Sequence, residues 1–103
     1  EHERMVQALA VVSGEVIGSV FGDLKADGTV VLDLIQINAR YRGNGIGQRL
    51  IEQFRENARG MGATRIVIEN FNPEFGVNID RTRRFYRQCG FVAVDDGSFF
   101  MNL

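Results

Sequence analysis

Three apolar runs open the chain, and each is bounded by turn-forming residues. Their content of Val, Leu and Ile is typical of β-strands. Asp27-Gly28 precedes the third run and supplies the positive φ that a tight hairpin needs. The third run is apolar on both faces, as expected for a central strand whose faces are covered. The predicted strands are residues 5–13, 15–24 and 29–38, and we expect them to form an antiparallel meander.

Helical periodicity begins after residue 45. Apolar side chains recur at helical spacing from Ile46 to Met61, and Gly60 and Gly62 stand where such a helix would stop. A second amphipathic stretch has Thr82, Phe85, Tyr86 and Cys89 as its inner stripe. The remaining predicted elements are a strand at 64–70, a polar loop at 71–78, a helix with Asp80 as its N-cap and Gly90 as its stop, and strands at 91–94 and 98–103, with a turn at 95–97.

The element order is therefore β-β-β-α-β-α-β-β. With 103 residues, the chain is expected to form a single domain. Because a strand–helix–strand unit follows the meander, its two strands should be parallel. The predicted fold is α/β (α+β), with a mixed, mostly antiparallel sheet and helices on its faces.

Composition excludes several kinds of chemistry. Net charge is −1, and no apolar run approaches the length of a membrane span, so neither a general nucleic-acid binder nor a membrane protein is expected. The single histidine is His2, so a Ser-His-Asp triad, a Cys-His pair and a multi-histidine metal site are excluded, and we expect no metal. Cys89 is the only cysteine, which fits a reducing compartment and leads us to expect a cytoplasmic protein.

A glycine-rich loop joins the third strand to the first helix. Gly43, Gly45 and Gly47 lie next to Arg42. Free N–H groups at a helix start can bind phosphate, and glycines allow the backbone to approach it closely. Glycines alone fit equally a tight strand-to-helix turn. A dinucleotide motif would need one more residue between the last two glycines, and a P-loop would need Gly-Lys-Ser/Thr, so both are disfavoured.

Two motifs together resemble the GNAT family of N-acetyltransferases. The stretch 41–50 (YRGNGIGQRL) resembles the family signature of Arg or Gln followed by x-x-Gly-x-Gly/Ala. The stretch 84–91 (RFYRQCGF) resembles its FYxxxGF ending. Their order and separation fit the family, and the resemblance covers about residues 15–103. It implies an acyl-CoA N-acyltransferase fold, with acetyl-CoA as co-substrate and transfer of an acetyl group to a primary amine.

The resemblance also implies where the cofactor lies. Acetyl-CoA would occupy a V-shaped gap between the strands at 29–38 and 64–70. Its pantetheine would pair with the first of these strands, and its pyrophosphate would accept N–H groups from the glycine loop. The Ile37 N–H would bind the thioester oxygen. The expected cofactor-binding residues are Ile37, Asn38, Ala39, Arg42, Gly43, Asn44, Gly45, Ile46, Gly47 and Gln48.

Catalytic roles follow from the same resemblance. Tyr86 would donate a proton to the departing thiolate, and its alternative role is a core aromatic. Asp33 is the first candidate for the general base, because burial within an apolar strand would raise its pKa; its alternative is a solvent-facing or arginine-paired carboxylate. Glu69 is the second candidate, and a water chain could replace either. For Cys89, buried packing is favoured over an acetyl-cysteine.

The chain departs from the family pattern at its start. The family's usual first strand and two helices are missing, so residues 1–103 are expected to form a short or truncated domain with an open acceptor site. Such a site suits a protein or peptide amine better than a small molecule. A homodimer is conceivable for so small a chain. The competing function is a non-catalytic acetyl-CoA-binding regulatory module.

Overall fold

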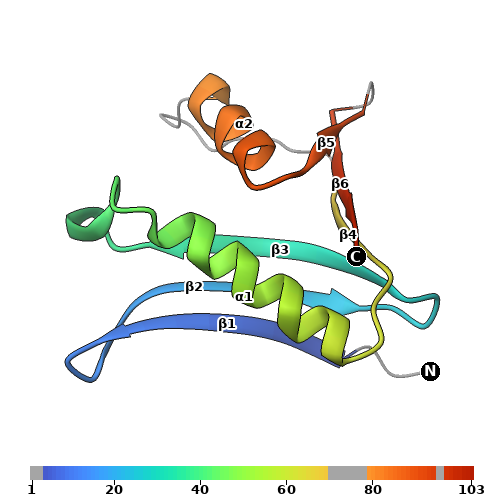
Figure 1. Ribbon diagram of the computed structural model, residues 1–103, viewed down its shortest axis with the longest axis horizontal. Coiled ribbons are helices and arrows are strands. Elements are labelled where there is room, and N and C mark those ends of the chain that lie inside the picture. Colours follow the sequence, from blue (N-terminus) through green and yellow to red (C-terminus); the bar gives the residue numbers. More distant parts are fainter. Residues whose placement is uncertain (1–3, 70–78, 95–96) are drawn as a thin grey trace.

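A computed structural model describes residues 4–69, 79–94 and 97–103. Its elements follow the predicted order, and its six strands form one sheet in the order β1-β2-β3-β4-β6-β5 (Figure 1). β3 and β4 pair in parallel, and the other neighbours are antiparallel. The elements are β1 (Arg4–Val12), β2 (Glu15–Leu24), β3 (Thr29–Ile37), the 3-10 helix η1 (Ala39–Tyr41), α1 (Ile46–Gly60), β4 (Arg65–Ile68), α2 (Ile79–Gln88), β5 (Val92–Ala93) and β6 (Phe99–Asn102).

The two hairpins of the meander use the turn residues that the sequence supplies. Between β1 and β2, Ser13 and Gly14 both have positive φ, at 50° and 81°, as in the two-residue turns that match the twist of paired strands. Between β2 and β3, the Thr29 N–H donates to Asp27 Oδ1 at 2.9 Å, and Gly28 has a φ of 90°. These turns fix the antiparallel register of the meander.

The hydrophobic core extends from the space between α1 and the meander to β4, β6 and α2. Figure 1 shows α1 crossing β1, β2 and β3. The inner stripe of α1 includes Leu50, Ile51 and Phe54, and all three are buried. Phe54 is fully enclosed, and truncation of such a ring to Ala costs about 3–5 kcal/mol. The helix ends at Gly60 as predicted, and Gly62 has a φ of 91°. This packing fixes where α1 begins, and with it the glycine loop.

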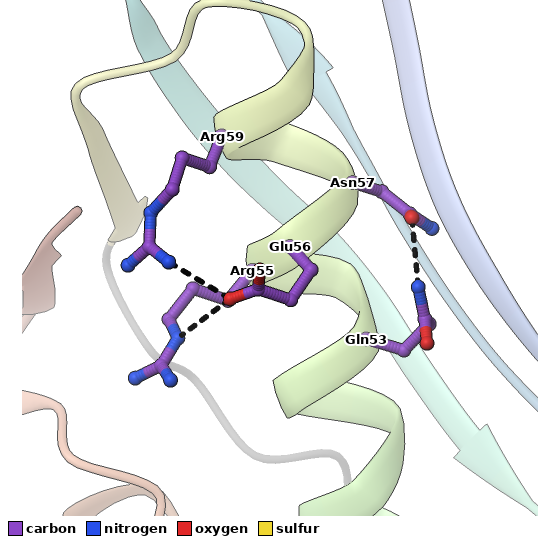
Figure 2. Close-up of polar contacts among 5 residues, drawn as sticks. All are labelled: Gln53, Arg55, Glu56, Asn57 and Arg59. Atoms are coloured by element: carbon purple, nitrogen blue, oxygen red, sulfur yellow. Dashed lines mark hydrogen bonds and ion pairs between the residues drawn. The ribbon is translucent and has the colours of Figure 1, made fainter.

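The outer side of α1 is polar (Figure 2). Arg59 pairs with Glu56 at 2.8 Å, and the Arg55 Nε lies 4.0 Å from the same carboxylate. On another side, Gln53 donates to Asn57, whose Nδ2 donates in turn to the Gln7 carbonyl of β1. Exposed ion pairs of this kind stabilise a protein by less than about 1 kcal/mol. The main effect of the α1 arginines is therefore to keep this side of the helix polar rather than to stabilise the fold.

Two details of the predicted fold were wrong. The second half of β3 is not covered on both faces: Leu34 is 38% exposed, and Gln36 is also exposed. Asp80 is not the N-cap of the second helix, because α2 begins at Ile79 and Asp80 lies within its first turn. A carboxylate there still interacts favourably with the helix dipole. The predicted loop at 71–78 and Asp95-Asp96 lie outside the described residues.

Candidate active site

A β-bulge divides β3 into two parts. Phe21 pairs with Leu34 and Gly22 pairs with Leu32, so Asp33 is the extra residue. A side chain at Gly22 could not fit, because its Cβ would lie 2.3 Å from the Val31 carbonyl oxygen. The bulge shifts the inward-facing positions by one residue. Before it, positions 30 and 32 are buried; after it, positions 35 and 37 pack against the core.

The parallel ladder between β3 and β4 is short. It starts at Thr29 with Arg65 and stops after Val31 with Val67, three pairs in all. Antiparallel pairing of β3 with β2, in contrast, continues to Ile37. One edge of β3 therefore has no β4 partner beyond Val31. We call this the free edge of β3; it is the position that the predicted V-shaped gap requires.

The direction of the Ile37 N–H follows from its neighbour. The Asn38 N–H donates to the Ile17 carbonyl of β2 at 2.7 Å. Because successive residues of a strand direct their backbone polar groups to opposite edges, those of Ile37 point to the free edge. The Arg42 Nε donates to the Ile37 carbonyl at 3.3 Å, which is consistent with this direction. The Ile37 N–H thus faces the side of β3 on which the predicted gap between β3 and β4 lies.

Asn38 ends β3 through three hydrogen bonds. Its N–H is used by β2, its carbonyl accepts the Tyr41 N–H at 2.9 Å, and its side-chain oxygen accepts the Arg40 N–H at 3.0 Å. These bonds end β3 and start η1 at Ala39. The backbone N–H of Asn38 is thus used within the sheet, and a pantetheine group at this residue would have to bind the carbonyl or the side-chain amide. Ala39 is exposed, and its carbonyl accepts the Arg42 N–H.

The start of α1 has open backbone N–H groups. Gly45 is its N-cap in the left-handed conformation, with no side-chain cap, and Arg49 donates to the Gly45 carbonyl. The N–H groups of residues 46–48 precede this first helical bond and have no partner within the helix. Gly43 and Gly45 have φ of 85° and 76°, and a Cβ at either would meet no atom within 4 Å. Asn44 Nδ2 donates to the Tyr41 carbonyl at 3.4 Å.

These features give the loop the properties of an anion site. The helix dipole, the open N–H groups and the nearby Arg42 guanidinium all favour negative charge. The exposed glycines leave room for a ligand beside the backbone. The structure therefore brings Arg42, the glycine loop and the free edge of β3 together, as the sequence predicted.

The two candidate bases lie at the point where the strands separate. Asp33 stands two residues beyond Val31, and Glu69 stands two residues beyond Val67, the partner of Val31 in the last rung. Both carboxylates are exposed. Of the two alternatives left open for Asp33, the structure therefore favours the exposed carboxylate over the buried one, because the bulge interrupts the strand at this residue.

Tyr86 lies on the β6 side of this split. It is 5% exposed, and its ring centroid is 5.5 Å from that of Phe99 and 5.8 Å from that of Phe91. Phe99 pairs with Ile68, one residue beyond the last β3–β4 rung. Burial, and secondarily the Cys89 thiol, raise the pKa of Tyr86 above its ordinary value, so the phenol stays protonated at neutral pH.

Cys89 follows Tyr86 on the same face of α2 and is half-buried. Burial, and then the charge of Glu52, raise the pKa of its thiol to about 11. A thiol with so high a pKa holds little thiolate at neutral pH and is a poor nucleophile. This supports packing rather than covalent catalysis.

Comparison with known proteins identifies the family. The model of the acetyltransferase (GNAT) domain matches residues 4–93. The chain belongs to the GNAT acetyltransferase family. A glucosamine 6-phosphate N-acetyltransferase 1 of Oryza sativa subsp. japonica is 36% identical over 68 residues, which are 64% of this chain. The match spans only 36% of the rice protein.

Solved structures share the GNAT fold. An IAA acetyltransferase from Bacillus cereus aligns with a TM-score of 0.80 at 20% identity, over 97% of this chain and 79% of that one. An acetyltransferase from Bacillus anthracis, in complex with acetyl coenzyme A, aligns with a TM-score of 0.78 at 20% identity, over 96% of this chain and 62% of that one. The GNAT acyltransferase fold predicted from the sequence is therefore confirmed.

The bulge is the feature of this GNAT site that sequence reasoning missed. The sequence gives little signal of it, because apolar residues stand at both odd and even positions on each side of Asp33; only Gly22 marks an irregular position in the facing strand. In the described ranges, no helix is long and apolar enough to cross a membrane. Across the same ranges, no group of three or more His, Cys, Asp or Glu is arranged to hold a metal ion.

Proposed function

We propose that this chain transfers an acetyl group from acetyl-CoA to a primary amine. The observation that carries the proposal is the free edge of β3, which ends beside the uncapped, glycine-lined start of α1. A pantetheine chain could pair along that edge while its pyrophosphate binds the loop. Complexes of GNAT structural neighbours with acetyl coenzyme A or CoA support this choice of co-substrate.

In this mechanism each group has one role. The amine nitrogen attacks the thioester carbon, and the Ile37 N–H stabilises the oxyanion that forms. The carbon–sulfur bond then breaks, the Tyr86 phenol donates a proton to the thiolate, and the phenolate regains a proton from solvent before the next turnover. The amine's proton passes to Asp33, to Glu69 or through water to bulk solvent. Exposure of both carboxylates favours exchange with solvent, so no single buried base is required.

The acceptor we propose is an amine of a protein or peptide. Exposed carboxylates at the split suit an extended, cationic amine side chain, which a carboxylate can attract and deprotonate. The rice relative is named for an amino-sugar phosphate, so glucosamine 6-phosphate is the specific small-molecule competitor. Cytoplasmic location and action without a metal remain part of this proposal.

Calorimetric titration with acetyl-CoA tests the cofactor site. Arg42→Glu is the charge-reversed variant, and Arg59→Glu is the matched control on the outer side of α1. We expect saturable binding that only Arg42→Glu weakens, by at least about tenfold, since a charge-assisted contact contributes about 1.5–3 kcal/mol. No binding by the folded wild-type chain would refute the proposal.

Turnover separates the enzyme from a binding module. Release of CoA thiol is followed with glucosamine 6-phosphate, a lysine peptide and a free N-terminal peptide as acceptors. We expect acetylation of a peptide and a lower rate for Tyr86→Phe at unchanged acetyl-CoA affinity. Binding without turnover of any amine would favour the regulatory module. Asp33→Asn and Glu69→Gln then show which carboxylate, if either, sets the acid limb of the pH–rate profile.

A further inference from the structure

The third glycine of the loop differs from the other two. Gly43 and Gly45 have positive φ and open space around them, whereas Gly47 lies buried within α1. A Cβ on Gly47 would lie 2.8 Å from Phe85 Cε1 and 3.0 Å from Ile37 Cδ1. Carbon atoms in favourable contact are about 3.5–4.0 Å apart. The missing side chain at this position therefore makes room for the Phe85 ring.

Phe85 and Tyr86 support α2 on opposite sides of the split. The Phe85 ring lies against the start of α1 and close to the end of β3, while the Tyr86 ring packs on Phe99 of β6. The two rings also contact each other, with centroids 5.6 Å apart. Because successive helical residues point about 100° apart, the adjacent rings reach different neighbours. α2 is thus held at two points, one on each side of the strand separation.

We propose that Phe85 is a positioning residue: the packing of its ring against Gly47 fixes where the Tyr86 phenol lies relative to the glycine loop and the free edge of β3. This inference rests on the proposed catalytic role of Tyr86. It gives the missing side chain of Gly47 a purpose distinct from that of Gly43 and Gly45, because the space at Gly47 is filled by a ring from α2, whereas the space at the other two glycines is open. Cofactor loop and phenol then keep a fixed separation.

A pair of compensating substitutions at Gly47 and Phe85 tests whether this packing contact positions Tyr86. Gly47→Ala inserts the clashing methyl group, and Phe85→Leu removes the ring atoms that it would meet. We expect Gly47→Ala to lower kcat at least tenfold, and the double variant to recover to within threefold of wild type. Recovery through Phe85 would show that the clash, rather than a lost phosphate contact, causes the defect. Failure of Phe85→Leu to rescue, or a wild-type kcat in folded Gly47→Ala, would overturn the proposal.

Kinetics of Phe85→Ala supply the complementary test. Loss of the contact between the Phe85 ring and Gly47 should lower kcat at least tenfold. The KM for acetyl-CoA should stay within threefold of the wild-type value, because the loop backbone is unchanged. Thermal unfolding, followed by circular dichroism, confirms that each variant is folded at the assay temperature. An equal change in kcat and KM, or no change in kcat, would contradict a positioning role.

A spectroscopic readout does not depend on turnover. The chain has two tyrosines and no tryptophan, so in a Tyr41→Phe background the phenolate absorbance reports Tyr86 alone. Phe85→Ala should lower its titration midpoint by at least half a pH unit toward the ordinary value, with Cys89 the neighbouring titratable group in both proteins. An unchanged titration midpoint would refute the proposal that Phe85 positions Tyr86. If no amine is acetylated, the proposed function fails while this titration still decides the positioning.

Discussion

Gly22→Ala is the substitution that should disturb the site most from a distance. The added Cβ would lie 2.3 Å from the Val31 carbonyl oxygen and 2.9 Å from the Leu32 Cα. Non-bonded carbon and oxygen atoms approach to about 3.3–3.6 Å, so β2 and β3 must separate by about 1 Å. Neither obstructing atom belongs to a side chain that could rotate away. The bulge at Asp33 would therefore have to move or be lost.

The expected cost can be estimated from overpacked protein interiors. Extra atoms in a well-packed region typically cost about 1–3 kcal/mol, and two backbone contacts place this site at the upper end. For a domain near 100 residues, about 1 kcal/mol corresponds to about 4–8 °C in Tm. We therefore expect Gly22→Ala to lower Tm by about 10–20 °C. Acetyl-CoA affinity should fall as well, because the free edge of β3 begins at the bulge.

Gly60→Ala is the matched control. Gly60 ends α1, and a Cβ there would meet nothing within 4 Å. The same added methyl group should stabilise this site by up to about 1 kcal/mol, through helix propensity alone. Thermal unfolding by circular dichroism compares both variants with wild type. A Gly22→Ala protein that melts within about 2 °C of wild type would show that the strands adjust without strain, and would refute this reasoning.

Three further outcomes are expected. Gly45→Val should weaken acetyl-CoA binding about tenfold more than Gly45→Asn, because Asn tolerates the left-handed conformation at lower cost; equal affinities in calorimetry would argue against a strained loop. Cys89 should react with iodoacetamide about tenfold more slowly in the folded chain than in urea, because its lower thiolate fraction is only partly offset by greater nucleophilicity; equal rates would contradict its raised pKa. Folded Cys89 and Tyr86 hold protons that the unfolded chain releases, so the free energy of unfolding should be steady below pH 9.0 and fall as pH rises toward about 11; a urea midpoint that stays constant over this range would count against both shifts.

Local signals in the sequence predicted most of the fold. The stripe from Ile46 to Met61 and the turn at Asp27-Gly28 depend on neighbours along the chain, and both were confirmed. The position of Asp33 could not be predicted this way, because a bulge is a property of two paired strands. The start of α2 was misplaced by two residues, since an acidic side chain is favourable both as an N-cap and in the first turn.

The candidate site was predicted in its parts rather than in its arrangement. The motif located the glycine loop but treated its glycines alike, although Gly47 differs from Gly43 in conformation and surroundings. The motif could not show that the Asn38 N–H helps to end β3, because this group donates to the distant Ile17 carbonyl. The sequence shows which side chains could take part in chemistry. The hydrogen-bond partner of each backbone group, in contrast, is known only from the folded structure.

The short β3–β4 ladder has a consequence for how the molecule assembles. Residues 4–60 form the meander and α1, and the consecutive strands of the meander pair over long antiparallel ladders, so this half should fold early and exchange its amide hydrogens slowly. The half containing β4, α2, β5 and β6 joins it through a parallel ladder of three residue pairs, a shared hydrophobic core and the Phe85 contact. We therefore expect it to open first under native conditions. A ligand that binds both halves would couple them, so hydrogen exchange in β4 and α2 should slow when acetyl-CoA binds.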